Sequence, residues 1–360
     1  MIVGGSLVGL CAALALANKG ASVVVVERTS AGAHEGGGGL GIDVDAIKLV
    51  TRLTTSPPVC HGVDRDTTAW HLVRDWLEHS AEQVPAITLF HDALATTVTS
   101  DDSGVSVTAA DGRTWWGDVI IGADGVHSTV RRFVDPEHPT AEYAGFVLWR
   151  AMVSEALVRP VAKLPSAGEP SREFYVDRYR LVTYPVPGVD GDRAVGHRRL
   201  NVVWYDPARE ELLRESGLLE GGVVRGSLQS SDISGEISEE LRTIALQAWP
   251  SPWAETLRIA FDQRLVFGTP VAEYVPRRLV LDRIAISGDA AHAASPMVGG
   301  GFQQGLIDAY ELARSFAESD DVTAMLSSYE RVRLDAARQH AMGSQQESRR
   351  LLERGARPRP

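Results

Sequence analysis

The alternation of apolar and polar positions over the first 27 residues predicts a strand, a helix and a second strand. The apolar residues 1–3 lead into a glycine-rich turn, and residues 10–19 have the small, apolar composition of a buried helix. Residues 23–26 are four consecutive valines, which is typical of a strand buried on both faces. The pattern predicts a βαβ unit with an acidic residue, Glu27, directly after its second strand.

The glycine turn at residues 4–9 is predicted to bind a dinucleotide. Gly4 allows a sharp exit from the strand and Gly9 allows close packing of helix on strand, while Ser6 replaces the middle glycine of the usual G-x-G-x-x-G pattern. The free amides at the helix start favour a pyrophosphate. Glu27 follows Gly4 by 23 residues, which is close to the roughly 20 residues expected for a carboxylate that binds a ribose hydroxyl. An ordinary βαβ turn without a ligand is the alternative interpretation.

The first strand is unusually short, since at most three residues precede the turn whereas strands commonly have about 5–6. The first strand of a βαβ unit of this kind lies in the centre of the sheet. We therefore expect either a true start further upstream or a shortened chain.

A second strand–turn–helix stretch covers residues 117–132. The apolar residues 119–121 lead into Gly-Ala-Asp-Gly at 122–125, and a helix is expected to begin near Ser128. This arrangement is typical of a phosphate or ribose site at the carboxyl end of a strand.

A third such stretch covers residues 283–313. The buried strand predicted at 284–287 meets Gly288 and Asp289, and a loop with Pro296 and the glycines at 299–301 follows. The apolar positions from residue 302 onward have helical spacing, so a long helix is expected to begin there.

The segment between the first two stretches contains EGGGGLGI at residues 35–42, which is either a mobile, solvated loop or backbone in very close contact with a ligand. Helices are expected at residues 45–53 and 67–79, followed by β-hairpins over residues 87–121.

Residues 141–275 show a different pattern, with strands separated by turns. In the segment at 199–205 the odd and even positions are both largely apolar, so both faces of the predicted antiparallel sheet are in use. Leu200, Val202 and Trp204 share one face, whereas Asn201, Val203 and Tyr205 share the other. We expect one face to pack on a core and the other to cover a cleft.

Composition limits the possible functions. The 360 residues are 44% hydrophobic, which favours two domains, and the net charge of −11 argues against nucleic acid as a partner. No apolar run approaches the roughly 20 residues of a membrane span, so a cytoplasmic protein without a membrane partner is expected. Two cysteines and ten scattered histidines give no ligand spacing for a metal, and none is expected.

The three stretches, in this order, resemble the single-component FAD-dependent aromatic hydroxylases of the para-hydroxybenzoate hydroxylase type. Residues 122–131 match G-A-D-G-x-x-S-x-x-R, and residues 288–301 match G-D-A-A-H-x-x-x-P-x-x-G-x-G. The segments at 143–150, 184–188 and 198–205 are similar to the 2,6-dihydroxypyridine 3-hydroxylase subgroup.

The resemblance implies an α/β fold. An FAD-binding Rossmann-like domain of the glutathione reductase type would comprise residues 1–142 and 276–320. An inserted antiparallel-sheet substrate domain would comprise residues 143–275, and a C-terminal helical segment residues 321–360.

The resemblance also implies an NAD(P)H-dependent flavoprotein monooxygenase. Such an enzyme hydroxylates an electron-rich aromatic or N-heteroaromatic ring, phenol-like or hydroxypyridine-like, with dioxygen through a flavin hydroperoxide. The alternatives are an FAD-binding reductase or halogenase-like enzyme and a non-catalytic FAD-binding protein, although the halogenase signature W-x-W-x-I-P is absent. The substrate, the choice between NADH and NADPH, and whether the protein forms a homodimer stay open.

The family pattern further implies roles for single residues. Glu27 would bind the adenosine ribose and Asp289 the ribityl or pyrophosphate region of FAD. Asp124 and Arg131 would serve the pyrophosphate and the approach of the nicotinamide donor. The full set of expected cofactor-binding residues lies in the three motifs: Gly4, Ser6, Leu7, Gly9, Glu27, Arg28, Asp124, Arg131, Gly288, Asp289, Gly299, Gly300, Gly301 and Phe302.

Two residues of the third motif are candidate catalytic residues. Pro296 would stand beside the reacting edge of the flavin ring. His292 has the pKa range of a proton-transfer group, but we favour the alternative of a histidine that orders the loop through hydrogen bonds. The candidates for the substrate pocket come from the predicted sheet: Arg150, Tyr184, Asn201 and Tyr205. Residues 35–42 contain no arginine, and Ala69 or Trp70 occupies a position that is often arginine in the family.

Overall fold

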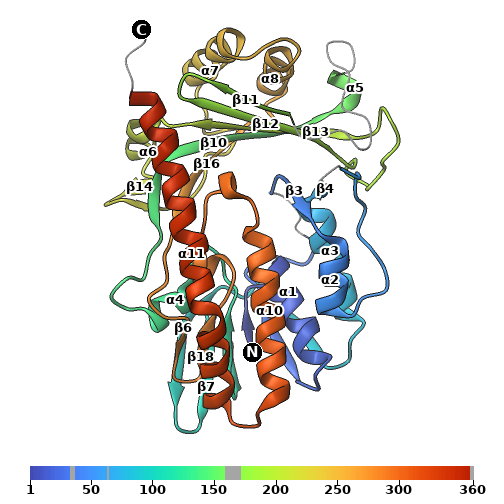
Figure 1. Cartoon of the computed structure of the whole chain (residues 1–360), viewed down its shortest axis with the longest axis vertical. Helices are drawn as coiled ribbons and strands as arrows, with labels where there is room; N and C mark the ends of the chain where they lie inside the picture. The colour runs from blue at the N-terminus through green and yellow to red at the C-terminus, as the bar shows by residue number, and fades with distance from the viewer. Residues whose placement is uncertain (33–36, 63–64, 159–171, 357–360) are drawn as a thin grey trace.

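The computed structural model describes residues 1–32, 37–62, 65–158 and 172–356. Figure 1 shows a lower unit of helices and a parallel sheet, an upper antiparallel sheet covered by helices, and one long helix beside both. The α/β fold with an inserted antiparallel sheet that the sequence predicts is confirmed. The exact division into an FAD-binding and a substrate domain stays a proposal.

The lower unit is built on a six-stranded sheet that contains the first strand of each of the three motifs. Its strands are, in spatial order, β17 (Val280–Leu281), β18 (Ile284–Ile286), β9 (Ile120–Gly122), β1 (Ile2–Val3), β2 (Val23–Val26) and β5 (Ile87–Phe90). Strand β1 pairs in parallel with β2 and β9, and β9 pairs in parallel with β18. The carboxyl ends of these strands therefore lie at one edge of the sheet, and the three turns that follow them come together there.

The short strand β1 is central, as expected, and is held on both sides. Its two residues pair with Val25 and Val26 on one side and with Ile121 and Gly122 on the other. Helix α1 (Leu7–Ala17) follows. Its own side chains are small or apolar on every face, and nine of its eleven residues are buried.

The remaining helices of the lower unit surround this sheet. They are α2 (Val44–Thr51), α3 (Trp70–Glu82), α4 (Thr129–Val134), α9 (Asp289–His292), the 3-10 helix η1 (Pro296–Val298) and α10 (Gly301–Glu318). The hairpins expected over residues 87–121 form a three-stranded meander of β6 (Ala95–Asp101), β7 (Gly104–Ala109) and β8 (Thr114–Gly117), in addition to β5 and β9.

The helix predicted from residue 67 begins only at Trp70. The preceding residues form β4 (Asp66–Ala69), which pairs antiparallel with β3 (Gly39–Ile42). Hydrogen bonding to a strand distant in sequence overrides the local helical pattern. Of the glycine segment at 35–42, the first two residues lie outside the described residues, and Gly39 to Ile42 form β3.

The upper unit is a seven-stranded antiparallel sheet. Its strands are β10 (Glu142–Ser154), β11 (Arg172–Val176), β12 (Tyr179–Val186), β13 (Arg199–Asp206), β14 (Leu219–Glu220), β15 (Val223–Val224) and β16 (Phe267–Glu273). Four helices accompany it: α5 (Glu155–Val158), α6 (Glu210–Glu215), α7 (Gly235–Ala248) and α8 (Trp253–Asp262). Helices α7 and α8 cover the outer face, and β3 and β4 lie beneath the inner face (Figure 1).

The two predicted faces of the segment at 199–205 are confirmed. Leu200, Val202 and Trp204 belong to the main core, where the Trp204 ring meets the Trp249 ring at a centroid distance of 6.1 Å. On the other face, Val203 and Tyr205 belong to a separate, smaller apolar cluster.

Helix α11 (Val322–Ala356) connects the two units. In the lower unit the Tyr329 hydroxyl donates to the Ile286 carbonyl of β18 at 2.9 Å. In the upper unit Ser344 and Ser348 both donate to Oε1 of Glu273 on β16, at 2.5 and 2.8 Å. None of the described helices is both long and apolar enough to cross a membrane.

Candidate active site

One cavity of about 1280 Å³ lies between the turns of the lower sheet and the inner face of the upper sheet. Residues of all three motifs line it, together with residues of β10, β12 and β13. Its volume exceeds the roughly 300–1000 Å³ of an ordinary small-molecule site. It is therefore large enough for a large ligand and a second, smaller one.

The first glycine turn forms one end of the cavity and has no room for side chains. Gly4 has a φ of +104°, and a Cβ there would lie 2.3 Å from the Ala123 carbonyl oxygen. A Cβ on Gly9 would lie 1.9 Å from the Gly4 oxygen. Gly9 itself does not line the cavity but permits the close packing of α1 that sets the turn.

The start of α1 is free to bind an anion. Ser6 occupies the N-cap position without a side-chain capping hydrogen bond, and the first turn contains no acidic residue. Ser6 and Leu7 line the cavity. Unpaired amides and the positive end of the helix dipole fit a diphosphate at this end.

Glu27 lies at the same end, beside Arg28. Its Oε2 accepts from the Gly5 amide at 2.6 Å, and its Oε1 accepts from the amide and hydroxyl of Thr29 at 2.8 and 2.6 Å. The carboxylate thus fixes the glycine turn to β2 while it faces the cavity.

Asp124 and Arg131 of the second motif have different positions. Asp124 lines the cavity, and its carboxylate accepts from the Thr129 amide at 2.7 Å and the Ser128 hydroxyl at 2.5 Å, which caps α4. Burial raises the pKa of Asp124. Arg131 lies behind the wall, where its guanidinium donates to the Ala290 carbonyl at 3.1 Å and lies 4.5 Å from the centre of the Tyr274 ring. Arg131 therefore joins the second motif to the third and does not face the cavity.

Asp289 extends into the cavity from the carboxyl end of β18. Gly288, behind it, has a φ of +58° and packs against Val8 of α1. The side chain of Asp289 is exposed to the cavity, and desolvation by the surrounding protein raises its pKa, while the charges of His292 and Arg131 oppose the rise. The glycines at 299–301, together with Pro296 and Phe302, continue this wall up to the start of α10.

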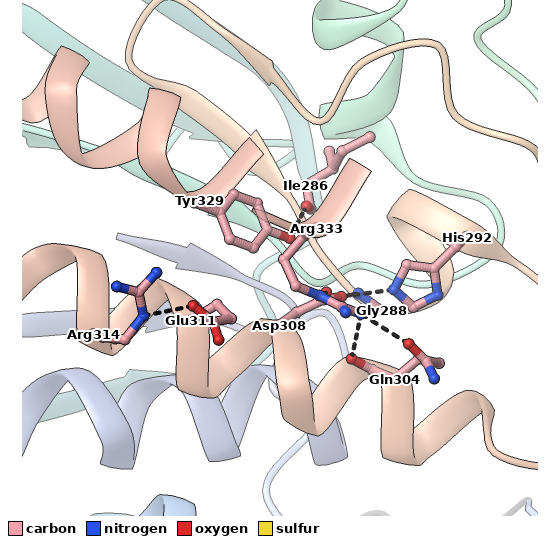
Figure 2. Close-up of polar contacts among 9 residues, drawn as sticks. All are labelled: Ile286, Gly288, His292, Gln304, Asp308, Glu311, Arg314, Tyr329 and Arg333. Carbon is pink, nitrogen blue, oxygen red and sulfur yellow. Dashed lines mark hydrogen bonds and ion pairs between the residues drawn. The ribbon is translucent and has the colours of Figure 1, made fainter. Parts of the chain in front are cut away.

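His292 lies beneath the wall in a buried polar network (Figure 2). Its Nε2 is 2.6 Å from Oδ2 of Asp308, which also accepts from the Gly288 amide at 2.9 Å. The other oxygen of Asp308 accepts from Nε of Arg333 at 2.7 Å, and Arg333 donates to Gln304 as well. Burial lowers the pKa of His292 because it disfavours the charged imidazole. The charge of Asp308 and its hydrogen bond raise this pKa, and the net shift is upward.

This network joins β18, α10 and α11 directly behind the third motif. His292 is fully buried and does not line the cavity, whereas Pro296 does. Of the two interpretations of His292, the geometry favours the histidine that orders the loop.

Three of the four pocket candidates, Arg150, Tyr184 and Tyr205, line the cavity from the upper sheet. The fourth, Asn201, is fully buried, and its Oδ1 accepts from the Gly39 amide at 2.8 Å. A Cβ on Gly39 would lie 2.8 Å from both Asn201 and Tyr184. The glycine segment thus brings its backbone directly against the upper sheet, and its predicted close contact with a ligand stays a prediction.

Sequence reasoning missed several cavity residues, above all Arg65 and Arg74, with Trp70 and Arg180. Arg65 directly precedes β4, and a Cβ on Gly299 would lie 3.4 Å from its Nη1. The positive charge that residues 35–42 lack therefore comes from neighbouring elements. No local motif marks Arg65, because the pairing of β3 with β4 brings it to the cavity.

Comparisons with known proteins agree with this geometry. Residues 143–263 match a family described as FAD binding domain-like, and residues 257–344 match one described as FAD binding domain. The chain is 25% identical to 2,6-dihydroxypyridine 3-monooxygenase of Paenarthrobacter nicotinovorans over 91% of this chain and 85% of that protein. It is 30% identical to the FAD-dependent urate hydroxylase of Klebsiella oxytoca over 65% of this chain, but the match spans only 52% of that relative.

A solved structure shows the same fold. The 2,6-dihydroxypyridine-3-hydroxylase from Arthrobacter nicotinovorans superimposes with a TM-score of 0.80 at 22% identity, covering 100% of this chain and 93% of that one. The likeness includes both the lower unit and the inserted sheet.

Proposed function

Since residues 257–344 match the FAD binding domain family and the chain is similar to FAD-dependent hydroxylases, we propose that it is an FAD-dependent monooxygenase of electron-rich aromatic or N-heteroaromatic rings. The nicotinamide donor, NADH or NADPH, and dioxygen would be its co-substrates. The observation that carries the proposal is the continuous cavity that extends from the first glycine turn to the inner face of the upper sheet.

The residues present fit FAD. Ser6 and Leu7 offer free amides for the diphosphate, and Glu27 faces the cavity beside them. Asp289 offers a carboxylate that can accept from cofactor hydroxyl groups. The glycines at positions 4 and 9 keep the first turn free of side chains, as close approach of a diphosphate requires.

When bound, FAD would supply the redox chemistry: it accepts electrons from the nicotinamide donor and activates dioxygen so that one oxygen atom is transferred to the ring. The start of α10 contributes electrostatically, since Gly300 caps it without a side-chain hydrogen bond and its first turn contains no acidic residue. Such a helix end favours negative charge on a reduced cofactor.

The apolar part of the cavity excludes water from the reacting ring. Val182 and Val203 on the upper sheet and Pro296, Met297 and Phe302 on the third motif line it. Water exclusion limits loss of the activated oxygen as hydrogen peroxide and strengthens the electrostatic interactions inside.

The test is anaerobic reduction of the FAD-loaded protein by NADH and NADPH, with and without a panel of phenols and hydroxypyridines, followed by turnover in labelled dioxygen. A productive ring compound should accelerate reduction and leave one labelled oxygen atom in a hydroxylated product. Peroxide without labelled product across the panel would indicate an oxidase. A flavin that no ring compound affects would contradict the hydroxylase function.

A further inference from the structure

The loop between α9 and α10 forms part of the cavity wall and carries Pro296. Its residues 294–303 all line the cavity. Within the loop, the Ser295 hydroxyl accepts from the Met297 amide at 3.2 Å, and the Pro296 carbonyl accepts from the Gly299 amide at 3.1 Å. These bonds join residues two or three positions apart, so they shape the loop but do not fix its place relative to the rest of the protein.

Helix α11 holds this loop through the hydroxyl of Ser344. The Ser344 oxygen accepts from the Ser295 amide at 2.7 Å, and the same hydroxyl donates to Oε1 of Glu273 on β16 at 2.5 Å. All three residues are buried. A buried amide that loses its partner is costly, so the bond from Ser295 to Ser344 fixes the loop backbone directly before Pro296.

Glu273 determines how the Ser344 hydroxyl is oriented. A serine hydroxyl has one hydrogen to donate and lone pairs that accept. Because the hydrogen of Ser344 goes to a carboxylate, its lone pairs are left for the Ser295 amide. A charged acceptor also gives a stronger hydrogen bond, and linked hydrogen bonds strengthen one another. The end of an upper-sheet strand thus acts on the cavity wall through one side chain of α11.

A second contact from the same strand end holds the other side of the loop. The Tyr274 amide, directly after β16, donates to the Ala293 carbonyl at 2.9 Å. The Tyr274 ring is itself fixed, since its hydroxyl donates to Asp135 at 2.8 Å. The residues that hold the loop at positions 293 and 295 therefore come from the upper sheet and α11.

We propose that Ser344, oriented by Glu273, is a positioning residue that sets the place of the Pro296 loop in the cavity wall and, through this loop, the seat of the FAD ring. The proposal rests on the proposed function, because it needs FAD in the cavity. Ser344 acts only through the loop. Without its hydroxyl the loop has a wider range of positions, so the wall fits the cofactor less closely and admits more water.

The test compares Ser344→Ala with the matched control Ser348→Ala. Ser348 is also buried, lies one helical turn further along α11 and donates to the same Oε1 of Glu273 at 2.8 Å. Within the described residues it forms no hydrogen bond to the loop. Each variant removes one hydroxyl donor from Glu273, so both should lose similar stability, but only Ser344→Ala leaves the Ser295 amide without its acceptor.

Hydrogen–deuterium exchange, followed by mass spectrometry on peptides that cover residues 293–303, measures how firmly the loop is held. Ser344→Ala should exchange about 2- to 10-fold faster there, as expected for the loss of one hydrogen bond. Ser348→Ala should exchange at the wild-type rate. The measurement is made with and without FAD, and the FAD-free protein tests the hold on the loop independently of the proposed function.

The visible circular dichroism of bound FAD reports the surroundings of its ring. Ser344→Ala should change this spectrum at full FAD occupancy, whereas Ser348→Ala should leave it as in the wild type. A general loss of stability would affect both variants alike.

Three results would overturn the proposal: an unchanged exchange rate in Ser344→Ala, an equal increase in both variants, or faster exchange with an unchanged spectrum of bound FAD. A wild-type protein that binds FAD but hydroxylates no ring compound would contradict the proposed function alone, because exchange and spectrum still decide the role of Ser344. Hydroxylation by a wild type whose Ser344→Ala variant behaves like Ser348→Ala would overturn this inference alone.

Discussion

Replacing Asp308 by asparagine tests the buried network of Figure 2, because it removes a charge without changing the size of the side chain. Asp308 is fully buried and accepts from the Gly288 amide, His292 and Arg333. The variant leaves the Arg333 guanidinium buried without its carboxylate. Removing one partner of a buried ion pair typically costs about 3–5 kcal/mol of unfolding free energy.

The expected change in melting temperature follows from the chain length. With about 2.1 cal/mol/K of unfolding entropy per residue and a single transition, this cost corresponds to a decrease of about 4–7 °C. Differential scanning calorimetry of the FAD-free protein measures it. Asp102→Asn, in the exposed turn between β6 and β7, is the matched control and should leave the melting temperature unchanged.

The effect should also depend on pH in a defined direction. The pKa of His292 is raised in the folded protein. Its contribution to the free energy of unfolding is therefore complete below the unfolded pKa of about 6.5 and declines as the pH rises through the folded pKa. Burial would raise the pKa of Asp308, but the charge of His292 and its hydrogen bond lower it overall. The contribution of Asp308 to the free energy of unfolding is therefore complete above about pH 4 and declines as the pH falls through the folded pKa.

The difference between wild type and Asp308→Asn should therefore be largest between about pH 4 and 6.5 and smaller at about pH 9, where only the pair with Arg333 contributes. A difference that grows from about pH 6 to about pH 9 would refute this reasoning. A variant with the melting temperature of the wild type at every pH would refute it as well.

Three further predictions concern the cavity wall and the contact of α11 with the upper sheet. Asp289→Ala should fold normally but bind FAD about 10- to 100-fold more weakly, as measured by flavin fluorescence, and wild-type affinity would contradict its assignment. Gly39→Ala should lower the unfolding free energy by about 1–3 kcal/mol in a thermal melt because its Cβ has no space, whereas Gly235→Ala, where a Cβ meets no atom within 4 Å, should not. Ser344→Ala should cost about 1–3 kcal/mol in the same assay because it removes a donor from buried Glu273, and an unchanged melt would exclude this contact as a stabilising one.

The parts of the fold that the sequence predicts are those fixed by local pattern. The valine run at residues 23–26 can only be a buried strand, and the apolar positions of residues 199–205 define two faces whatever the strand pairs with. Glycine turns at strand ends likewise have a local physical cause. The three motifs and most of the cavity wall follow from such features.

The remaining site depends on contacts between residues far apart in the chain. His292 has its partners on α10 and α11, and nothing near position 292 indicates that Asp308 and Arg333 would meet it. Arg65 reaches the cavity only because β4 pairs with β3. Asn201, predicted in the pocket, instead holds β3, since the strand approaches more closely than a periodicity can indicate.

Helix α11 also limits how the cavity can change shape. At about 1.5 Å per residue its 35 residues extend roughly 52 Å, a stiff rod anchored at both ends. Tilting the upper sheet as a rigid body would shear the contacts of Ser344 and Ser348 with Glu273 and the bond from Arg338 to the Pro276 carbonyl. Hinge-like rocking of the two units is thus expected to be costly, so we expect the change of shape that exchanges ligands of unequal size to occur at the two-stranded β3–β4 sheet.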